Sequence, residues 1–266
     1  MKILVAVKQV AALDEDFAIR DDGRDIDPDF LIRDLNEWDD FSLEEAVKIK
    51  EGAGEPVEVV VVSVGSGEVD ESLRKCLAKG ADRAIRVWDS GVEGSDSIAI
   101  ARVLAAVAKR ESPHMLFAGV QSSDQSFAST GIAAAAFLDW PHAAVVSSLS
   151  YSPGAKSAVF RRELEGGLLH EVEIQCPAVL TIQLGINTPR YASLRSIKQA
   201  AAKPIEVLSL ADLALGAADV GEAGSLSRVR RMYIPDKGRA QLIDGDAAQQ
   251  AARLAEIIRE FKGAGA

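Results

Sequence analysis

Positions 117–131 read Phe117-Ala-Gly-Val-Gln-Ser-Ser-Asp-Gln-Ser-Phe-Ala-Ser-Thr-Gly131, a polar loop of small residues. The apolar run Met115–Ala118 leads into this loop, and the helix-like segment Ile132–Leu138 follows it. A strand that ends in such residues directly before a helix points N–H and hydroxyl groups at one place, where the helix dipole favours an anion. The segment therefore predicts a phosphate-binding loop. Because the loop contains no lysine or arginine, a monophosphate or pyrophosphate fits it better than a triphosphate.

Strands and helices alternate on both sides of this loop. Strands are predicted at Lys2–Val7, Val57–Val64, Ala84–Trp88, His114–Ala118 and Ala143–Ser148, with a short hairpin around Asp21-Asp-Gly23. The capping box Ser42-Leu-Glu-Glu45 predicts one helix start, a second helix is predicted from about Asp70 to Ala78, and Ser95 is the predicted cap of a third. This alternation predicts an α/β fold: a doubly wound, mostly parallel, Rossmann-like sheet with right-handed crossovers.

The pattern changes after about residue 150. Strand-like segments follow at Ala158–Glu163, Leu168–Gln175 and Ala178–Gln183, of which the first two predict an antiparallel hairpin added to the sheet's edge. Residues 187–203 read as an exposed loop and a short helix, residues 213–227 as a linker, and the segment after Asp246 as a final amphipathic helix. We therefore expect an α/β domain at 1–205 and a linker with a C-terminal arm and helix at 206–266.

Composition excludes several classes of function. The formal net charge of −10 argues against non-specific nucleic-acid binding, which needs a basic surface. No apolar run reaches the roughly 18 residues of a membrane span, and the chain begins directly with a strand, so we expect a cytoplasmic protein without membrane insertion. The two cysteines, Cys76 and Cys176, and the three histidines have no metal-binding or catalytic spacing, which predicts neither a metal site nor a catalytic group.

Other nucleotide-binding motifs are incomplete. Gly65-Ser-Gly67 follows a strand and precedes a helix, but Asp70 stands where a dinucleotide fingerprint has its third glycine. This departure and the lack of a catalytic pair weaken an NAD-dependent dehydrogenase as an interpretation. Asn36-Glu-Trp-Asp-Asp40 has two interpretations: a solvated acidic turn, or a segment whose Asn36 and Asp39 reach a ribose or base at the sheet's carboxyl edge.

Several motifs together resemble the β (small) subunit of electron transfer flavoprotein. They are Lys2-Ile-Leu-Val-Ala-Val-Lys8, Asn36 with Leu43-Glu-Glu-Ala46, Gly119-Val-Gln-Ser-Ser-Asp124 with Thr130-Gly131, Arg162-Glu-Leu-Glu-Gly-Gly167, Pro177-Ala-Val-Leu-Thr181, and Pro189-Arg-Tyr-Ala-Ser-Leu194. The similarity extends to about residue 205, and its second half is the more specific. The resemblance implies an adenine-nucleotide-hydrolase-like fold and a heterodimer, in which the α subunit carries redox-active FAD and the β subunit holds a structural AMP.

The resemblance also implies site residues. Carried over position by position, the AMP pocket consists of Ala6, Asn36, Glu37, Trp38, Asp39, Val64, Gly119, Val120, Gln121, Ser122, Ser123, Asp124, Gln125, Ser126, Phe127, Ala128, Ser129 and Thr130. Leu13 and Trp38 would lie near the flavin of the partner subunit, although family members often have an aromatic residue in place of Leu13.

A recognition loop near 187–200 is implied in the same way. Its docking residues would be Pro189, Arg190, Tyr191, Ser193, Leu194 and Arg195, with Leu194 as the apolar anchor. The implied function is that of an electron carrier and not an enzyme: flavin dehydrogenases donate electrons, and a quinone reductase or similar acceptor takes them. The C-terminal arm and helix are expected to pack on the α subunit.

Two further interpretations remain open. A stand-alone ATP-binding module of the universal-stress-protein type has the same kind of sheet, but it leaves the recognition-like loop and the final helix without a role. An electron-bifurcating relative would hold a second FAD in place of AMP. Co-purification with a larger flavin-bearing chain tests the first interpretation, and a count of flavins per heterodimer tests the second.

Overall fold

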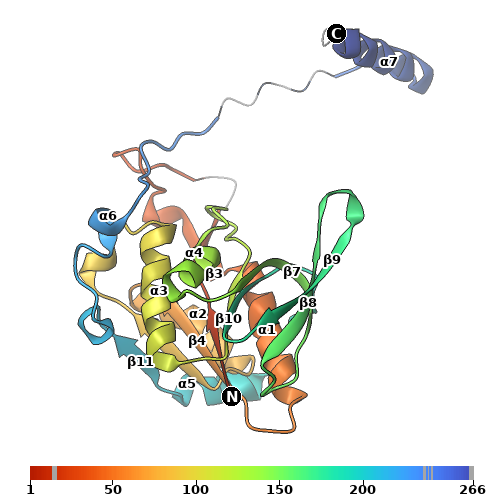
Figure 1. Cartoon of the computed structure of the whole chain (residues 1–266). Coiled ribbons are helices and arrows are strands. Elements are labelled where there is room, and N and C mark those ends of the chain that lie inside the picture. The colour runs from red at the N-terminus through yellow and green to blue at the C-terminus, as the bar shows by residue number, and fades with distance from the viewer. Residues whose placement is uncertain (14–16, 236–237, 239, 241, 264–266) are drawn as a thin grey trace. The chain divides into compact units, whose positions relative to one another are not determined.

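The structure is a computed structural model that describes residues 1–13, 17–235, 238, 240 and 242–263 (Figure 1). The strands and helices follow one another as β1 (Lys2–Ala6), β2 (Gln9–Leu13), β3 (Leu31–Leu35), α1 (Glu37–Glu51), β4 (Glu58–Val64), α2 (Asp70–Ala78), β5 (Arg83–Val87), α3 (Ser97–Glu111), β6 (Met115–Gly119), α4 (Thr130–Leu138), β7 (His142–Ser150), β8 (Ser157–Glu163), β9 (Leu169–Gln175), β10 (Ala178–Ile182), α5 (Leu194–Ala202), β11 (Ile205–Leu208), α6 (Gly221–Gly224) and α7 (Ala247–Gly263).

The main sheet has the strand order β11-β5-β4-β1-β6-β10-β7-β8-β9. Strands β11 to β7 run parallel, with Ile3 of β1 opposite Val59 of β4 on one side and Met115 of β6 on the other. Strands β7, β8 and β9 pair antiparallel at one edge. The doubly wound, mostly parallel sheet with an added antiparallel hairpin is therefore confirmed.

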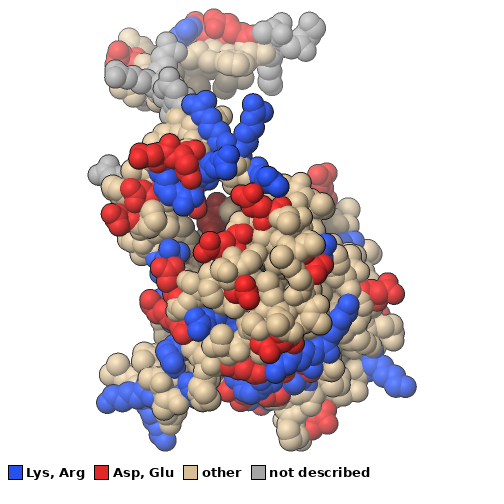
Figure 2. All heavy atoms as spheres, turned by 90° about the vertical axis from the view of Figure 1, so that its left-hand side faces the viewer, with Lys and Arg blue, Asp and Glu red and all other residues tan. Residues whose placement is uncertain are grey.

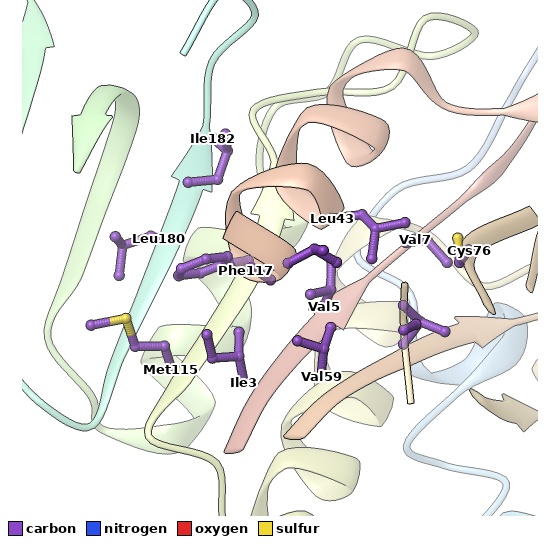
Figure 3. Packing of buried hydrophobic residues seen from close by; sticks show 14 of the residues in the cluster. Ile3, Val5, Val7, Leu43, Val59, Cys76, Met115, Phe117, Leu180 and Ile182 are labelled. Carbon is purple, nitrogen blue, oxygen red and sulfur yellow. The ribbon is translucent and has the colours of Figure 1, made fainter. Parts of the chain in front are cut away.

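Helices cover both faces of this sheet because side chains alternate along its strands. Ile3 and Val5 of β1 point into the core that α1, α2 and α5 cover, whereas Leu4 and Ala6 point toward α3 and α4. Figure 3 shows the first of these cores, where Val5 lies beside Leu43 of α1 and Phe117 of β6. Phe117 is fully buried there. The continuous apolar runs of the sequence thus correspond to strands buried on both faces.

Two predicted helix starts are displaced. Helix α1 begins at Glu37, after Asn36, so Ser42 lies inside the helix, where its hydroxyl donates to the carbonyl of Trp38 (2.9 Å). The acidic residues 37, 39 and 40 occupy the first turn, where the helix dipole favours negative charge. Asp96, not Ser95, caps α3, because its Oδ1 accepts from the backbone N–H groups of Ile98 and Ala99. A capping pattern can therefore occur within a helix or one residue away from the true cap.

Two segments were not placed by the sequence patterns. Strand β10, the third of the late strands, lies inside the sheet between β6 and β7, where every residue is buried. A two-stranded ribbon, β2–β3, stands apart from the main sheet. Neither placement follows from local periodicity, because pairing between distant strands is a tertiary property.

The predicted linker at 213–227 is wrong. Leu213 and Val220 are buried in the core beside α3, and α6 lies within the segment. Asp96 holds the end of this segment, since its Oδ2 accepts from the N–H groups of Leu226 (2.8 Å) and Ser227 (2.9 Å). The Gly/Ala-rich composition of this segment suggested a linker without regular structure. Its few large apolar residues are nevertheless enough to anchor it in the core.

The chain divides into two compact units after Arg230. The first, Met1–Arg230, contains the sheet, so it extends beyond the boundary expected near 205. The second, Arg231–Ala266, contains α7, on which Leu254, Ile258 and Phe261 are exposed.

Acidic and basic side chains are interspersed on the face that Figure 2 shows, without one extended basic surface. Among the described residues, no helix combines the length and apolar character that crossing a membrane requires. The same part of the chain contains no cluster of three or more potential His, Cys, Asp or Glu metal ligands.

Candidate functional site

The predicted phosphate-binding residues gather at the carboxyl ends of the central strands. Strand β1 ends at Ala6, β4 at Val64 and β6 at Gly119, and the loop of residues 120–129, here called the cradle loop, connects β6 to α4. Ligands of open α/β sheets bind at this edge.

Asp39 holds the strand ends together. Asp39 is 5 % exposed, and its carboxylate accepts hydrogen bonds from the backbone N–H of Lys8, which lies between β1 and β2 (2.7 Å), and from that of Gly119 at the end of β6 (2.9 Å). Burial raises the pKa of Asp39 to about 7, and the N–H donors partly oppose this shift. Both oxygens are thus engaged by the backbone, so Asp39 ties the segment that follows β1 to the end of β6.

Asn36 connects the start of α1 to the cradle loop. It is 1 % exposed; its Nδ2 donates to the carbonyl of Gln121 (2.9 Å), and its Oδ1 accepts from the N–H of Ser123 (3.2 Å). The structure therefore brings Asn36, Asp39 and the cradle loop together through contacts within the chain.

Glycine is required at Gly119. A Cβ there would lie 2.5 Å from both Oδ1 of Asp39 and Cβ of Trp38. The indole of Trp38 is itself fixed, because its Nε1 donates to Oε1 of Gln183 (3.1 Å). The close approach of β6 to the first turn of α1 therefore depends on the missing side chain.

The C-terminal half of the cradle loop presents unpaired backbone donors. Among the described residues, the N–H groups of Phe127, Ala128 and Ser129 find no acceptor, and those of residues 130–132 begin α4 and have no partner within the helix. Ser126 (φ 53°) and Ala128 (φ 51°) adopt the left-handed conformation. Alternation of left- and right-handed residues turns successive N–H groups toward one side, a geometry that binds anions.

Lys8 supplies the cation that the loop sequence lacks. Its Nζ lies 2.7 Å from Oδ1 of Asp124, 3.2 Å from Oγ of Ser122 and 3.2 Å from Oε1 of Gln125. The sequence patterns did not single out this residue, although it follows the first buried strand and the carboxyl ends of parallel strands meet at one edge.

The remaining predicted pocket residues lie around these contacts. Glu37 is exposed at the start of α1, and Phe127 is 55 % exposed on the cradle loop. Val120 donates its N–H to the carbonyl of Ile182 (3.1 Å), which attaches the start of the loop to β10. The backbone of Leu13 pairs with Leu31 in the β2–β3 ribbon, and its side chain is outside the described part of the structure.

The predicted docking loop has one fixed side and one free side. Arg190 is fixed on α1, since its guanidinium donates to both carboxylate oxygens of Glu44 (2.9 and 3.0 Å) and also pairs with Glu51. These carboxylates raise the pKa of Arg190, and Arg190 in turn lowers the pKa of Glu51. Tyr191 and Leu194, by contrast, are 98 % and 81 % exposed.

Of the other docking residues, Ser193 and Arg195 belong to the start of α5, and Pro189 precedes the helix. Ser193 caps the helix by accepting from the N–H of Ser196 (3.1 Å), Arg195 is exposed, and Pro189 is half-buried. Within the loop, Arg190 thus has partners inside the chain, whereas the aromatic and aliphatic side chains next to it project outward.

Comparisons with known proteins identify the family of this chain. A family model described as electron transfer flavoprotein domain matches residues 33–213. The chain is 70 % identical over 264 residues to an electron transfer flavoprotein subunit beta of Methylophilus methylotrophus, covering 99 % of this chain and all of that protein. It is 38 % identical to the subunit beta of Bradyrhizobium diazoefficiens and 36 % to that of Homo sapiens, each over 80 % of this chain and 83 % of the relative. The chain therefore belongs to the electron transfer flavoprotein family, as a β subunit.

Proposed function

We propose that this chain pairs with an α subunit, holds a structural AMP in the cradle loop, supports the FAD of its partner and docks dehydrogenases that deliver electrons. A β subunit of this family is part of an electron carrier and not an enzyme. FAD supplies the redox chemistry when it is bound. The residues of this chain would bind the nucleotide, support the FAD of the partner subunit and dock the dehydrogenase.

The row of unpaired N–H groups at 127–132 carries the nucleotide proposal. These donors and Lys8, whose ammonium contacts Ser122 of the same loop, are groups that suit a phosphate, because backbone N–H groups at a helix start and an ammonium both stabilise negative charge. Asn36 and Asp39 hold the loop in place around them. A nucleotide that binds only the folded chain adds stability by linkage.

Release of nucleotides from the heterodimer tests the proposal. The chain is co-expressed with its α subunit, the purified complex is denatured, and the released nucleotides are identified and counted by mass. We expect one AMP and one FAD per heterodimer. Two FAD molecules and no AMP would favour the bifurcating alternative, and FAD without any second adenine nucleotide would contradict the pocket. A chain that purifies alone with ATP would favour the universal-stress-type module.

We propose that the partner subunit covers the apolar residues of α7. Leu254, Ile258 and Phe261 are exposed within their own unit. A helix with an exposed apolar stripe gains stability when another surface covers that stripe. The α subunit is the partner that membership of this family implies.

The docking role is assigned to Tyr191 and Leu194. Large exposed side chains on a fixed loop form a small hot spot, which suits a transient complex. Leu194→Ala should weaken docking by about 2 kcal/mol, or about 30-fold in the dehydrogenase concentration needed for half-maximal reduction. Stopped-flow reduction of the flavin at limiting dehydrogenase concentration measures the effect.

Leu168→Ala serves as the matched control, because Leu168 is also exposed (67 %) but lies in the turn between β8 and β9. Both variants should keep their full FAD content. An unchanged reduction rate in Leu194→Ala at limiting concentration would exclude Leu194 as the anchor.

A further inference from the structure

We propose that Lys8 and Asp124 act as a charge-matched pair that restricts the cradle loop to a nucleotide with a single phosphate group. The inference rests on the proposed function and names the residues that select its ligand. The pair is a specificity determinant of the site, and neither residue takes part in electron transfer.

The backbone of Lys8 is fixed on both sides. Its N–H donates to Oδ2 of Asp39 (2.7 Å), and its carbonyl accepts from the N–H of Asn36 (2.9 Å). The side chain therefore starts from a fixed point at the end of β1, and its ammonium reaches the cradle loop from there. The backbone is therefore held in place, while the torsions of the side chain still allow the ammonium to change its contacts within the loop.

The ammonium of Lys8 contacts polar side chains of the cradle loop. Its 2.7 Å ion pair with Asp124 is partly shielded, since the side chains are 40 % and 20 % exposed. Ser122 and Gln125 complete its contacts. In the described part of the chain, no other lysine or arginine hydrogen-bonds to residues 119–130. The loop therefore has one cation and one carboxylate in direct contact.

This charge balance suits one phosphate group. The unpaired N–H groups at 127–132 provide partial positive charge, and Lys8 can turn from Asp124 toward a phosphate oxygen. A second phosphate adds negative charge for which the loop has no second cation, and it meets the carboxylate of Asp124 as a like charge. The pair thus favours a monophosphate and opposes a pyrophosphate.

The AMP and ADP retained by the co-expressed heterodimer test the inference, because both nucleotides compete for the site in the cell. The released AMP, ADP and FAD are quantified by mass for each variant. The wild-type complex should hold AMP and less than about a tenth as much ADP. Asp124→Asn should raise the ratio of ADP to AMP about tenfold, because the repulsive charge is gone. Lys8→Met should lower the AMP content about tenfold relative to FAD, whereas Lys8→Arg keeps the charge and should retain AMP.

Two control variants test whether the loss of a charge elsewhere in the protein changes the nucleotide content in the same way as a change in Lys8 or Asp124. Lys75→Met removes a lysine from another ion pair, with Asp34 at 2.9 Å, and Asp139→Asn removes a carboxylate from the opposite end of α4. Both should keep the wild-type nucleotide content. Wild-type AMP and ADP content in Asp124→Asn and Lys8→Met would overturn the inference and leave the AMP proposal standing. A wild-type complex with neither nucleotide would overturn both.

Discussion

Gly119→Ala should destabilise the folded chain by about 3 kcal/mol and remove the nucleotide from the heterodimer. The added Cβ would lie 2.5 Å from Cβ of Trp38, which belongs to the first turn of α1 and cannot rotate away. It would also lie 2.5 Å from the oxygen of Asp39 that accepts the N–H of Gly119. Relief of the clash therefore separates β6 from α1 and breaks that hydrogen bond. Urea unfolding of the isolated chain and the nucleotide content of the complex measure the two effects.

Gly54→Ala is the matched control for this substitution. A Cβ at Gly54 meets no atom within 4 Å, and its φ is not positive, so we expect a change within about 0.5 kcal/mol. Equal stability of Gly119→Ala and wild type would show that β6 and α1 can move apart without cost. Full AMP content in Gly119→Ala would show that their close approach is not needed for the site.

Arg190→Met should lower the stability by about 2 kcal/mol and weaken docking at the same time. Glu44 keeps only 8 % of its side chain exposed, and without Arg190 it loses its cation and two charge-assisted hydrogen bonds. The loop that presents Tyr191 and Leu194 is then released from α1. Denaturant unfolding measures the first effect, and flavin reduction at limiting dehydrogenase concentration measures the second.

Arg161→Met is the control, since Arg161 pairs with Glu171 where both side chains are 55 % exposed. Such a surface pair contributes at most about 1 kcal/mol. The combined variant Arg190→Met with Glu44→Gln removes the unpaired carboxylate and should recover part of the lost stability. If Arg190→Met weakens docking without any change in stability, Arg190 acts directly on the dehydrogenase and not by fixing the loop.

The layers of the fold could be predicted because they depend on local patterns. The apolar runs that include Ile3 and Val59 can be buried only between two layers of helices, and the glycine, serine and threonine of residues 119–131 mark the turn into α4. These signals involve neighbouring residues, so one sequence is enough to recognise them.

The features that the sequence did not indicate depend on contacts between distant residues. Lys8 reaches the cradle loop from more than a hundred positions away, and no pattern within that loop indicates a cation. Asp39 looked like a ligand-facing acid, whereas the backbone N–H groups of Lys8 and Gly119 engage both of its oxygens. Arg190 looked like a docking charge, and Glu44 binds it within the chain. In each case the sequence showed a charged residue but did not indicate which distant residue it would contact.

The hydrogen bonds of Asp96 have a practical consequence for protein engineering. A single carboxylate caps α3 and also holds residues 226 and 227, shortly before the first compact unit ends at Arg230. Chimeras that exchange the tail between relatives downstream of this attachment leave every hydrogen bond of Asp96 intact. Such grafts would test whether the tail contributes to the choice of assembly partner while the first compact unit is left unchanged.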